Sequence, residues 1–258
     1  MNGSTMSSSV RRILVVMGAS LICLWGSAVS ANVLFQHVDD NDPTSATEGI
    51  NGWSLQTLGA GGSSTAVNDG GTPAWQIAVN AGGVYRYREG DLTQAQEIAL
   101  TDNGFRLRSR FRVVTPHATQ YDQEWSAELD TAGGVDSRIF LFRVNLDGNG
   151  DPVILAPHGG LSKTMVGAGS GYHDFVYEYV GANNGGTGAM FMDNQFVFAF
   201  NGLLNAGGGG VGGLHYQFDG NSGTTVNWTN GSLGVPEPGV AALATLAGLL
   251  FFRRSRRA

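Results

Sequence analysis

The sequence predicts an all-β protein whose body is a single antiparallel β-sandwich. Apolar and polar residues alternate in several segments, as they do in strands that bury one face. No segment keeps the i, i+3, i+4, i+7 apolar spacing of an amphipathic helix beyond two turns. The 258 residues include 40 glycines, which destabilise helix interiors and suit tight turns. Turn-forming segments recur roughly every 10 to 20 residues, as in sandwiches and jelly rolls.

The clearest predicted strand covers residues 105–113. Its arginines share one face and its apolar residues share the other, because successive side chains of a strand point to opposite faces. The arginines are Arg106, Arg108, Arg110 and Arg112, and the apolar residues are Phe105, Leu107, Phe111 and Val113. This pattern is typical of a half-buried antiparallel strand.

A hairpin is predicted next. Residues 138–146 alternate and then reach Asp147-Gly-Asn-Gly-Asp151, a run of turn-forming residues. Residues 152–155 follow as a short apolar strand. Two alternating segments joined by such a turn indicate a β-hairpin.

Two further strand pairs complete the predicted sandwich. Residues 174–180 and 189–200 form one pair, joined by the glycine-rich segment 181–188. Residues 212–218 and 225–228 are expected to form the last pair. The sandwich is therefore predicted to occupy residues 32–234.

Residues 1–31 have the features of a signal peptide. Arg11 and Arg12 precede an apolar stretch at 13–25, and small residues at Val29 and Ala31 suit signal peptidase. We expect cleavage between Ala31 and Asn32. Cleavage also removes Cys23, the only cysteine, so the mature protein is expected to fold without a disulfide.

Residues 235–258 form a tail of three parts. Pro236, Glu237 and Pro238 hold the chain extended, because proline cannot sit inside a helix. Residues 240–252 are apolar but shorter than the roughly 20 residues that a membrane-spanning helix needs. Arginines at 253–257 favour the cytoplasmic side of a membrane. An ordinary C-terminal anchor is one interpretation of this tail.

In order, spacing and terminal position, the tail resembles the PEP-CTERM sorting signal of exopolysaccharide-producing bacteria. The resemblance implies that an exosortase-type membrane protease processes the chain after signal peptidase. It also implies transient association with the inner membrane. The protein would then reach the cell envelope or extracellular matrix of a Gram-negative-type bacterium. The resemblance indicates a destination and leaves the role of the body open.

The charge of the body restricts its partners. Six of the 15 basic residues lie at 11–12 and 253–257, which leaves nine between residues 32 and 238 against all 21 acidic residues. Nucleic acid and anionic lipid are poor partners for such a surface. Divalent cations and glycans are compatible with it.

Several motifs of the body resemble the concanavalin A-like (laminin G-like) jelly rolls of exported bacterial proteins. These motifs are Gly52-Trp53 after an acidic loop, Tyr172-His173-Asp174 at the start of a strand, and Met192-Asp193-Asn194-Gln195 in a tight turn. The resemblance implies a jelly roll with a carbohydrate-related role. An immunoglobulin-like sandwich is the alternative.

Catalytic residues were sought in the laminarinase-like motif E-x-D-x-x-E, which such jelly rolls can carry. Glu128 and Asp130 match its first two positions, but Gly133 replaces the carboxylate that would protonate the leaving group. Glu128 and Asp130 are therefore expected to lie on a solvated strand face, opposite the arginines of 105–113. The five histidines are scattered, and the chain contains no Gly-x-Ser-x-Gly motif.

Calcium is the one ligand that the residues suggest. Asp147, Asn149 and Asp151 space three oxygen side chains as the start of an EF-hand loop does. Pro152 and His158 break that motif, and turn chemistry alone explains the three residues. Residues 39–42 are a second acidic cluster of the same kind.

Two functions remain. The first is a non-catalytic, envelope-sorted β-sandwich that binds glycan or matrix, with aromatic side chains that stack on sugars. Its candidate aromatics are Trp53, Trp75, Trp125 and Trp228, although each also suits a core position. The second is a divergent glycoside hydrolase of the laminarinase-like type that uses Glu124, Glu128 or Asp130.

Overall fold

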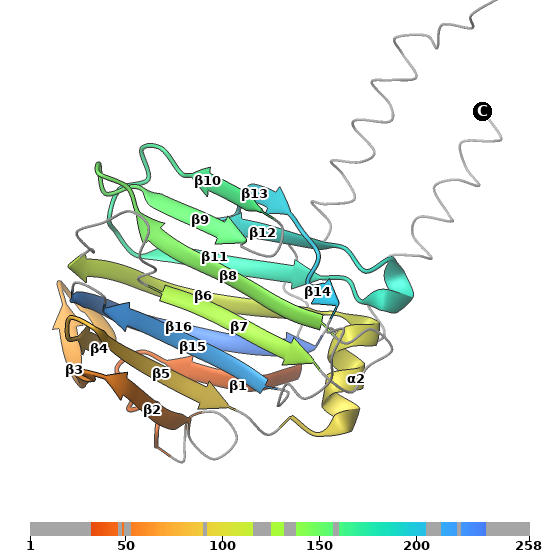
Figure 1. Ribbon diagram of the computed structural model, residues 1–258, viewed down its shortest axis with the longest axis horizontal. Helices are drawn as coiled ribbons and strands as arrows, with labels where there is room; N and C mark the ends of the chain where they lie inside the picture. The colour runs from red at the N-terminus through yellow and green to blue at the C-terminus, as the bar shows by residue number, and fades with distance from the viewer. Residues whose placement is uncertain are drawn as a thin grey trace, which may run out of the picture. The chain divides into compact units, whose positions relative to one another are not determined.

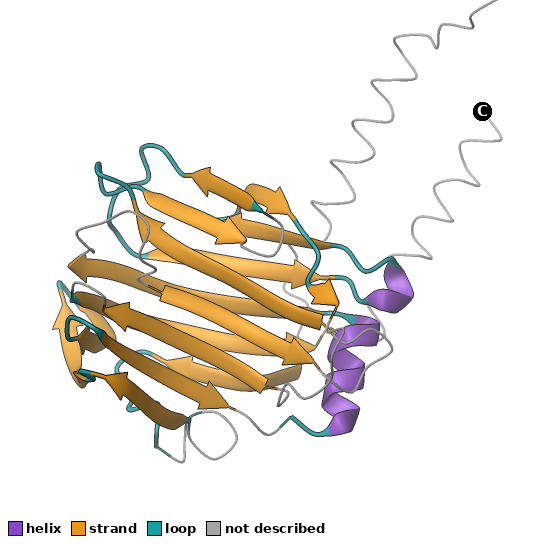
Figure 2. Ribbon diagram, in the orientation of Figure 1, coloured by secondary structure: helices purple, strands orange, loops and turns teal. Residues whose placement is uncertain are grey.

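The structure is a computed structural model. The described residues are 32–45, 48, 53–89, 92–115, 125–131, 138–156, 160–204, 213–220 and 223–235. Two antiparallel sheets pack face to face across a single core (Figures 1 and 2). The prediction of an all-β antiparallel sandwich is confirmed.

Sheet A lies at the back in Figure 1, and its strands follow the order β13-β12-β11-β6-β16-β4-β3, with β1 paired to β16. Its strands are β1 (Asn32–Val38), β3 (Gly62–Asp69), β4 (Thr72–Val79), β6 (Phe105–Thr115), β11 (His173–Tyr179), β12 (Gly188–Met192), β13 (Gln195–Ala199) and β16 (Thr224–Val235). The long strand β16 pairs with β6, β4 and β1, and so it ties the sheet together.

Sheet B faces the viewer in Figure 1, and its strands follow the order β10-β9-β8-β7-β15-β5-β2, with β14 paired to β8. Its strands are β2 (Ser54–Gly59), β5 (Gly83–Glu89), β7 (Trp125–Thr131), β8 (Arg138–Leu146), β9 (Pro152–Ala156), β10 (Leu161–Thr164), β14 (Leu203–Leu204) and β15 (Gly213–Gly220). Strand β7 is thus the middle strand of the seven on the main path.

The core between the sheets is rich in aromatic side chains. Trp228 on β16 is fully buried, and its ring centroid lies 4.9 Å from that of Tyr216 on β15 and 6.2 Å from that of Trp53. The indole Nε1 of Trp228 donates to the carbonyl oxygen of Asn230 at 2.8 Å, so burial leaves no polar atom of the ring unpaired. Trp53 and Trp75 are also buried. The interpretation of these three tryptophans as sugar-stacking surface residues is therefore wrong, and the side chain of Trp125 lies outside the description.

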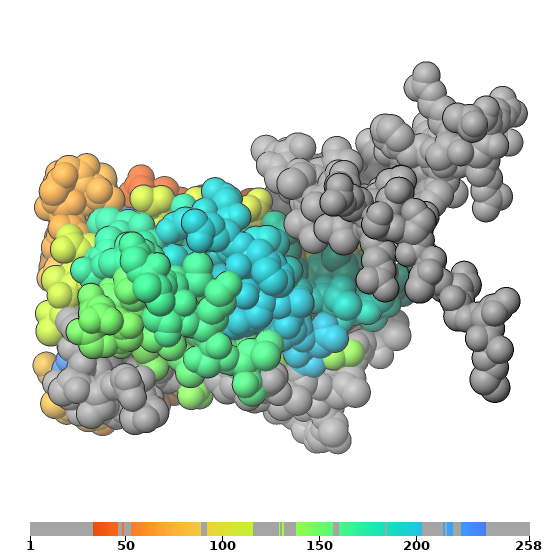
Figure 3. Space-filling model, turned by 90° about the horizontal axis from the view of Figure 1, so that it is seen from above, coloured from red at the N-terminus to blue at the C-terminus, as the bar shows by residue number. Residues whose placement is uncertain are grey.

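A lysine links the two sheets along one edge of the sandwich. Strands β10 and β13 are the neighbouring edge strands of sheets B and A. The Lys163 ammonium on β10 donates to the backbone carbonyls of Phe196 (3.1 Å) and Val197 (3.2 Å) on β13. Green and cyan segments cover this edge in the space-filling view (Figure 3). A lysine at a sheet edge also discourages pairing with another chain.

The structure corrects two details of the predicted strands. The segment 189–200 is two strands, because Asp193 and Asn194 adopt positive φ values of 50° and 64° and form a tight hairpin turn. The segments near 212–218 and 225–228 do not pair with each other, since β15 lies in sheet B and β16 in sheet A. Strands β6, β8 and β9 match their predicted segments.

The sequence analysis missed one helix, α2 (Gln94–Asn103), which lies at one end of the sandwich (Figure 1). Thr93 caps it: the Thr93 hydroxyl accepts from the backbone N–H of Gln96, and the Gln96 side chain accepts from the backbone N–H of Thr93. This reciprocal capping box satisfies two amides that a helix start leaves free. A short 3-10 helix, η3 (Ala182–Asn184), precedes β12.

The predicted signal peptide, 1–31, and residues 236–258 of the predicted tail 235–258 lie outside the described residues, whereas Val235 ends strand β16. Strand β1 begins at Asn32, the predicted first residue of the mature chain. In the part of the chain that the structure describes, no helix has the length and apolarity needed to cross a membrane.

Candidate functional site

The two carboxylates singled out in the sequence lie on the middle strand of sheet B. Leu129 and Thr131 on β7 are buried, so Glu128 and Asp130 occupy the alternate positions of that strand. Strand β7 belongs to sheet B and β6 to sheet A. The expectation that Glu128 and Asp130 lie opposite the β6 arginines is therefore wrong.

The strand register places a histidine directly beside Glu128. On β15, Leu214, Tyr216 and Phe218 are buried, and His215 lies between the first two. His215 pairs with Glu128 on one side and with Arg88 of β5 on the other. The first outer row of sheet B is Ser54, Arg88, His215, Glu128 and Leu141. The alternation of 214–218 indicates which face of its strand His215 occupies. The sequence does not indicate that this strand pairs with β7, so the pair was not predicted.

A second row runs beside the first on the same face. The second outer row of sheet B is Gln56, Arg86, Gln217, Ser126 and Arg143. The Nε of Arg86 donates to Gln217 Oε1 at 2.8 Å, and its Nη1 reaches Gln56 Oε1 at 3.5 Å. The two rows together cross five strands, from β2 to β8, and Glu128 lies on the fourth of them, β7.

The outer face of sheet A differs, because its arginines are matched by carboxylates. The shared face of the β6 arginines is confirmed. Arg108 and Arg110 both donate to Asp174, at 2.7 and 2.9 Å, and Arg112 donates to Asp69 at 2.9 Å. Hydrogen bonds from Asn227, Tyr172 and Arg112 lower the pKa of Asp69, and partial burial opposes them. On this face, Arg108, Arg110 and Arg112 therefore each have a carboxylate partner.

His173, from the motif Tyr172-His173-Asp174, lies between a carboxylate and a backbone carbonyl. Its Nδ1 lies 2.6 Å from Asp193 Oδ2, and its Nε2 lies 3.0 Å from the carbonyl oxygen of Gly169. Ser170 lines the same small recess. Because the Nε2 faces a carbonyl that can only accept, it carries a proton and cannot take one from Ser170. His173 therefore links a loop to the β12–β13 turn and forms no triad in this structure.

The predicted calcium residues lie in the turn between β8 and β9. Asp147 Oδ1 accepts the backbone N–H groups of Asn149 (2.8 Å) and Asp151 (2.9 Å). The buried Asp151 accepts instead from Gly167 (2.9 Å) and Gly169 (2.8 Å). Within the described ranges, no three His, Cys, Asp or Glu side chains gather as metal ligands. Calcium binding at this turn stays a prediction.

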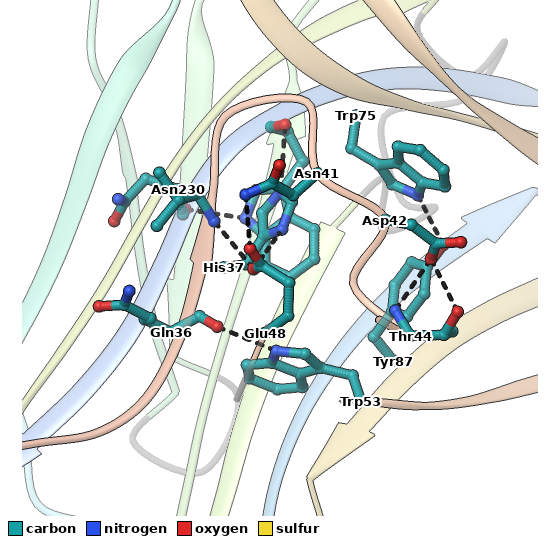
Figure 4. A network of polar contacts seen from close by, with 12 residues as sticks. Gln36, His37, Asn41, Asp42, Thr44, Glu48, Trp53, Trp75, Tyr87 and Asn230 are labelled. Atoms are coloured by element: carbon teal, nitrogen blue, oxygen red, sulfur yellow. Dashed lines mark hydrogen bonds and ion pairs between the residues drawn. The ribbon is translucent and has the colours of Figure 1, made fainter. Parts of the chain in front are cut away.

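The acidic loop 39–42 packs against a buried hydrogen-bonded pair, His37 and Glu48 (Figure 4). Glu48 accepts from His37 Nδ1 at 3.1 Å, from Asn41 Nδ2 at 2.9 Å and from the Val38 amide at 3.0 Å. Burial acts to raise the pKa of Glu48, but the hydrogen bonds from His37 and Asn41 outweigh it, so the pKa is lowered. In Figure 4, Trp53 also points at this loop, and its Nε1 donates to Gln36 O at 3.2 Å. The network fixes the first strand to the core.

Other predicted site residues lie outside the description. The sorting residues Pro236, Glu237 and Pro238, the cleavage residue Ala31 and the carboxylate Glu124 belong to this group.

No family model and no curated protein sequence matches the chain. Among solved structures, the conserved carbohydrate esterase vb_24B_21 of the Shiga toxin-encoding bacteriophage phi24B is 18% identical, with a TM-score of 0.60, over 81% of this chain and 100% of that one. An endo-β-1,4-glucuronan lyase from the fungus Trichoderma reesei is 12% identical, with a TM-score of 0.44, over 79% and 96%. The carbohydrate recognition domain of Emp47p is 14% identical, with a TM-score of 0.43, over 82% and 100%.

The comparison with the phage protein corrects the expectation of a non-catalytic body. That expectation rested on Gly133, which breaks one glycosidase motif. The sandwich of this chain is nevertheless shared, at a TM-score of 0.60, with a protein described as a carbohydrate esterase. The missing motif therefore does not exclude an enzyme. At 18% identity the shared feature is the fold.

Proposed function

We propose that the body is a carbohydrate-active enzyme that holds a glycan across the two outer rows of sheet B and cleaves it at Glu128. The observation that carries this proposal is the register that sets Glu128 directly beside His215 at the centre of the sheet. A carboxylate next to an imidazole is a common acid–base pair. The likeness to a protein described as a carbohydrate esterase supports a glycan as the substrate.

The reaction that suits these residues is hydrolysis of a glycosidic bond. Glu128 and Asp130 are two positions apart on one strand, so their Cα atoms lie about 7 Å apart. An inverting mechanism needs its two carboxyl groups roughly 6.5–9.5 Å apart, so that a water molecule fits. One carboxyl group protonates the leaving oxygen, and the other removes a proton from water as its oxygen attacks the anomeric carbon. His215 is a positioning residue that sets the protonation of Glu128.

The test is a screen of the purified protein against a panel of soluble polysaccharides, with new reducing ends as the readout. Wild-type protein should cleave at least one of them. Glu128→Gln should lose at least about 100-fold of the rate, since general acid–base groups contribute roughly 10² to 10⁴. Glu178→Gln on β11 is the matched control, because Glu178 lies in the other sheet and pairs with Arg106 at 3.4 Å.

Two results would overturn the proposal. One is a wild-type protein that cleaves none of the panel. The other is Glu128→Gln protein that keeps the wild-type rate. His215→Gln separates positioning from chemistry, because it should shift the pH profile of the rate and leave weak activity.

We further propose that the body is a concanavalin A-like jelly roll and is exported and sorted by its tail. The support is the order of parts in residues 1–31 and 235–258 and the motifs around Trp53 and His173. Pro236→Ala with Pro238→Ala should let a helix extend through the recognition segment, since alanine favours helix. That variant should stay in the inner membrane with its arginines intact. Equal retention in wild type would indicate a simple anchor.

A further inference from the structure

The arginines of the two sheets have different partners. On sheet A, Arg106, Arg108, Arg110 and Arg112 all form ion pairs with carboxylates. On sheet B, the described residues provide no ion pair for Arg86, Arg88 or Arg143, which lie in the two outer rows. Arg86 donates only to the neutral side chains of Gln217 and Gln56. Each described arginine of the β6 row thus has a carboxylate partner, whereas none of the described carboxylates pairs with Arg86, Arg88 or Arg143.

Two of these arginines also carry an unsatisfied buried donor. The Nε atoms of Arg88 and Arg143 are buried and have no hydrogen-bond partner among the described residues. The Nε of Arg112 on sheet A is also unpaired, but its Nη1 donates to both carboxylate oxygens of Asp69. An unpaired buried donor on a charged group is costly, so such groups are normally satisfied. Because these Nε atoms are buried, a ligand carboxylate would have to accept from the terminal Nη groups of Arg88 and Arg143.

The arginines flank the proposed reaction centre. Arg86 and Arg88 are on β5 and Arg143 is on β8, on either side of the central strands β15 and β7. Three strand spacings separate β5 from β8, a span of about 14 Å. The carboxylates that share the rows or their continuation are Glu128, Asp130 and Asp219, all on the central strands. Positive charge therefore lies on both sides of the point where cleavage is proposed.

We propose that the outer rows of sheet B select a polysaccharide that carries carboxylate groups, such as a polymer of uronic acids. Arginine suits this role, because its planar guanidinium binds carboxylate through two parallel hydrogen bonds. Arg88 would hold a carboxylate on one side of Glu128, and Arg143 would hold another on the opposite side. This inference rests on the proposed function and names its substrate class.

The test measures binding by calorimetry to two oligosaccharides that differ only in charge. One is a soluble β-1,4-linked glucan oligomer, and the other is its C6-oxidised form, in which carboxylates replace the primary hydroxyl groups. The Glu128→Gln protein is used, so that binding is measured without cleavage. Arg88→Gln and Arg143→Gln are made in the same background. Arg110→Gln on sheet A is the matched control, because Arg110 is already paired with Asp174.

The oxidised oligomer should bind at least about tenfold more tightly than the neutral one, the size of one charge-assisted hydrogen bond. Arg88→Gln and Arg143→Gln should each reduce that preference by about tenfold, and Arg110→Gln should not. Binding of the oxidised oligomer should also weaken as salt is added. The comparison of the two oligomers needs no arginine variant, so it still decides if an arginine substitution prevents folding.

Equal affinity for the two oligomers, or no affinity for either, would overturn the carboxylate inference. A preference that survives both arginine substitutions would overturn it too, because the carboxylates would then bind elsewhere. None of these results bears on cleavage of a neutral glycan at Glu128. Failure of the inference is therefore distinguishable from failure of the proposed function.

Discussion

The Nδ1 of His37 donates to the carboxylate of Glu48 at 3.1 Å, and both side chains are buried. Removing the acceptor of this pair leaves buried donors unpaired, which costs their desolvation free energy. His37 lies on β1 and Glu48 in the loop that follows it. The pair therefore connects the first strand of the body to the core beside Trp228, whose ring centroid lies 4.0 Å from that of His37.

Glu48→Ala should lower the free energy of unfolding by about 3 kcal/mol. It leaves His37 and the backbone amide of Val38 without their acceptor. Urea denaturation followed by tryptophan fluorescence measures the change. Asp40→Ala, at an exposed position of the same loop, is the control and should change stability by less than about 0.5 kcal/mol. Equal effects of the two substitutions would contradict the role of the buried pair.

The lowered pKa of Glu48 predicts that the stability of the protein depends on pH. The pKa of Glu48 is lower in the folded protein than its ordinary value of 4.5, so its contribution is fully present above pH 4.5. That contribution disappears as the pH falls through the lowered folded pKa. Melting temperatures of wild type and Glu48→Gln should therefore converge as the pH falls below 4.5. A constant difference down to pH 2 would contradict this assignment.

Asp151 should stabilise the loop at Gly167 and Gly169 without any cation. Both of its carboxylate oxygens accept backbone amides, and these hydrogen bonds lower its pKa. Asp151→Ala should reduce the melting temperature by several degrees, whether or not calcium is present. Millimolar calcium should leave the wild-type melting temperature unchanged. A rise with calcium that Asp147→Ala abolishes would show instead that the turn binds the ion, since a ligand of the native state stabilises it.

Thr93→Ala should destabilise the body by about 1 kcal/mol, the usual effect of removing a helix cap. The Thr93 hydroxyl accepts the Gln96 amide, and alanine leaves that amide unpaired. Thr93→Ser keeps the acceptor and should retain nearly full stability. If both variants unfold at the same urea concentration, the capping box does not contribute.

The strands could be predicted because the alternation of buried and exposed residues can be seen within each short segment of the sequence. In β6, alternation from Phe105 to Val113 reports one buried face directly, and the β8–β9 hairpin follows from the turn residues at 147–151. The helix α2 was missed because its apolar residues do not form a clear stripe, and Leu100 is its one buried aliphatic side chain. The spacing of Thr93 and Gln96 was the available signal for it.

The candidate site could be predicted only in part, because it depends on which strands become neighbours. Glu128 and Asp130 were visible in the sequence as two carboxylates on one strand face. Their relation to His215 and Arg88 arises from the pairing of β7, β15 and β5, which lie far apart in the sequence. Consecutive strands such as β15 and β16 lie in different sheets, so sequence order gave the wrong partner there.

The measurement that tests the central claim most directly is mass spectrometry of the products formed in ¹⁸O-labelled water. If Glu128 and Asp130 direct water at an anomeric carbon, each cleavage by wild-type protein should place one heavy oxygen at the new reducing end. Glu128→Gln should form no labelled product. Unsaturated products without label, heavy oxygen only in a released acyl group, or labelled fragments from Glu128→Gln would each contradict hydrolysis of a glycosidic bond at Glu128.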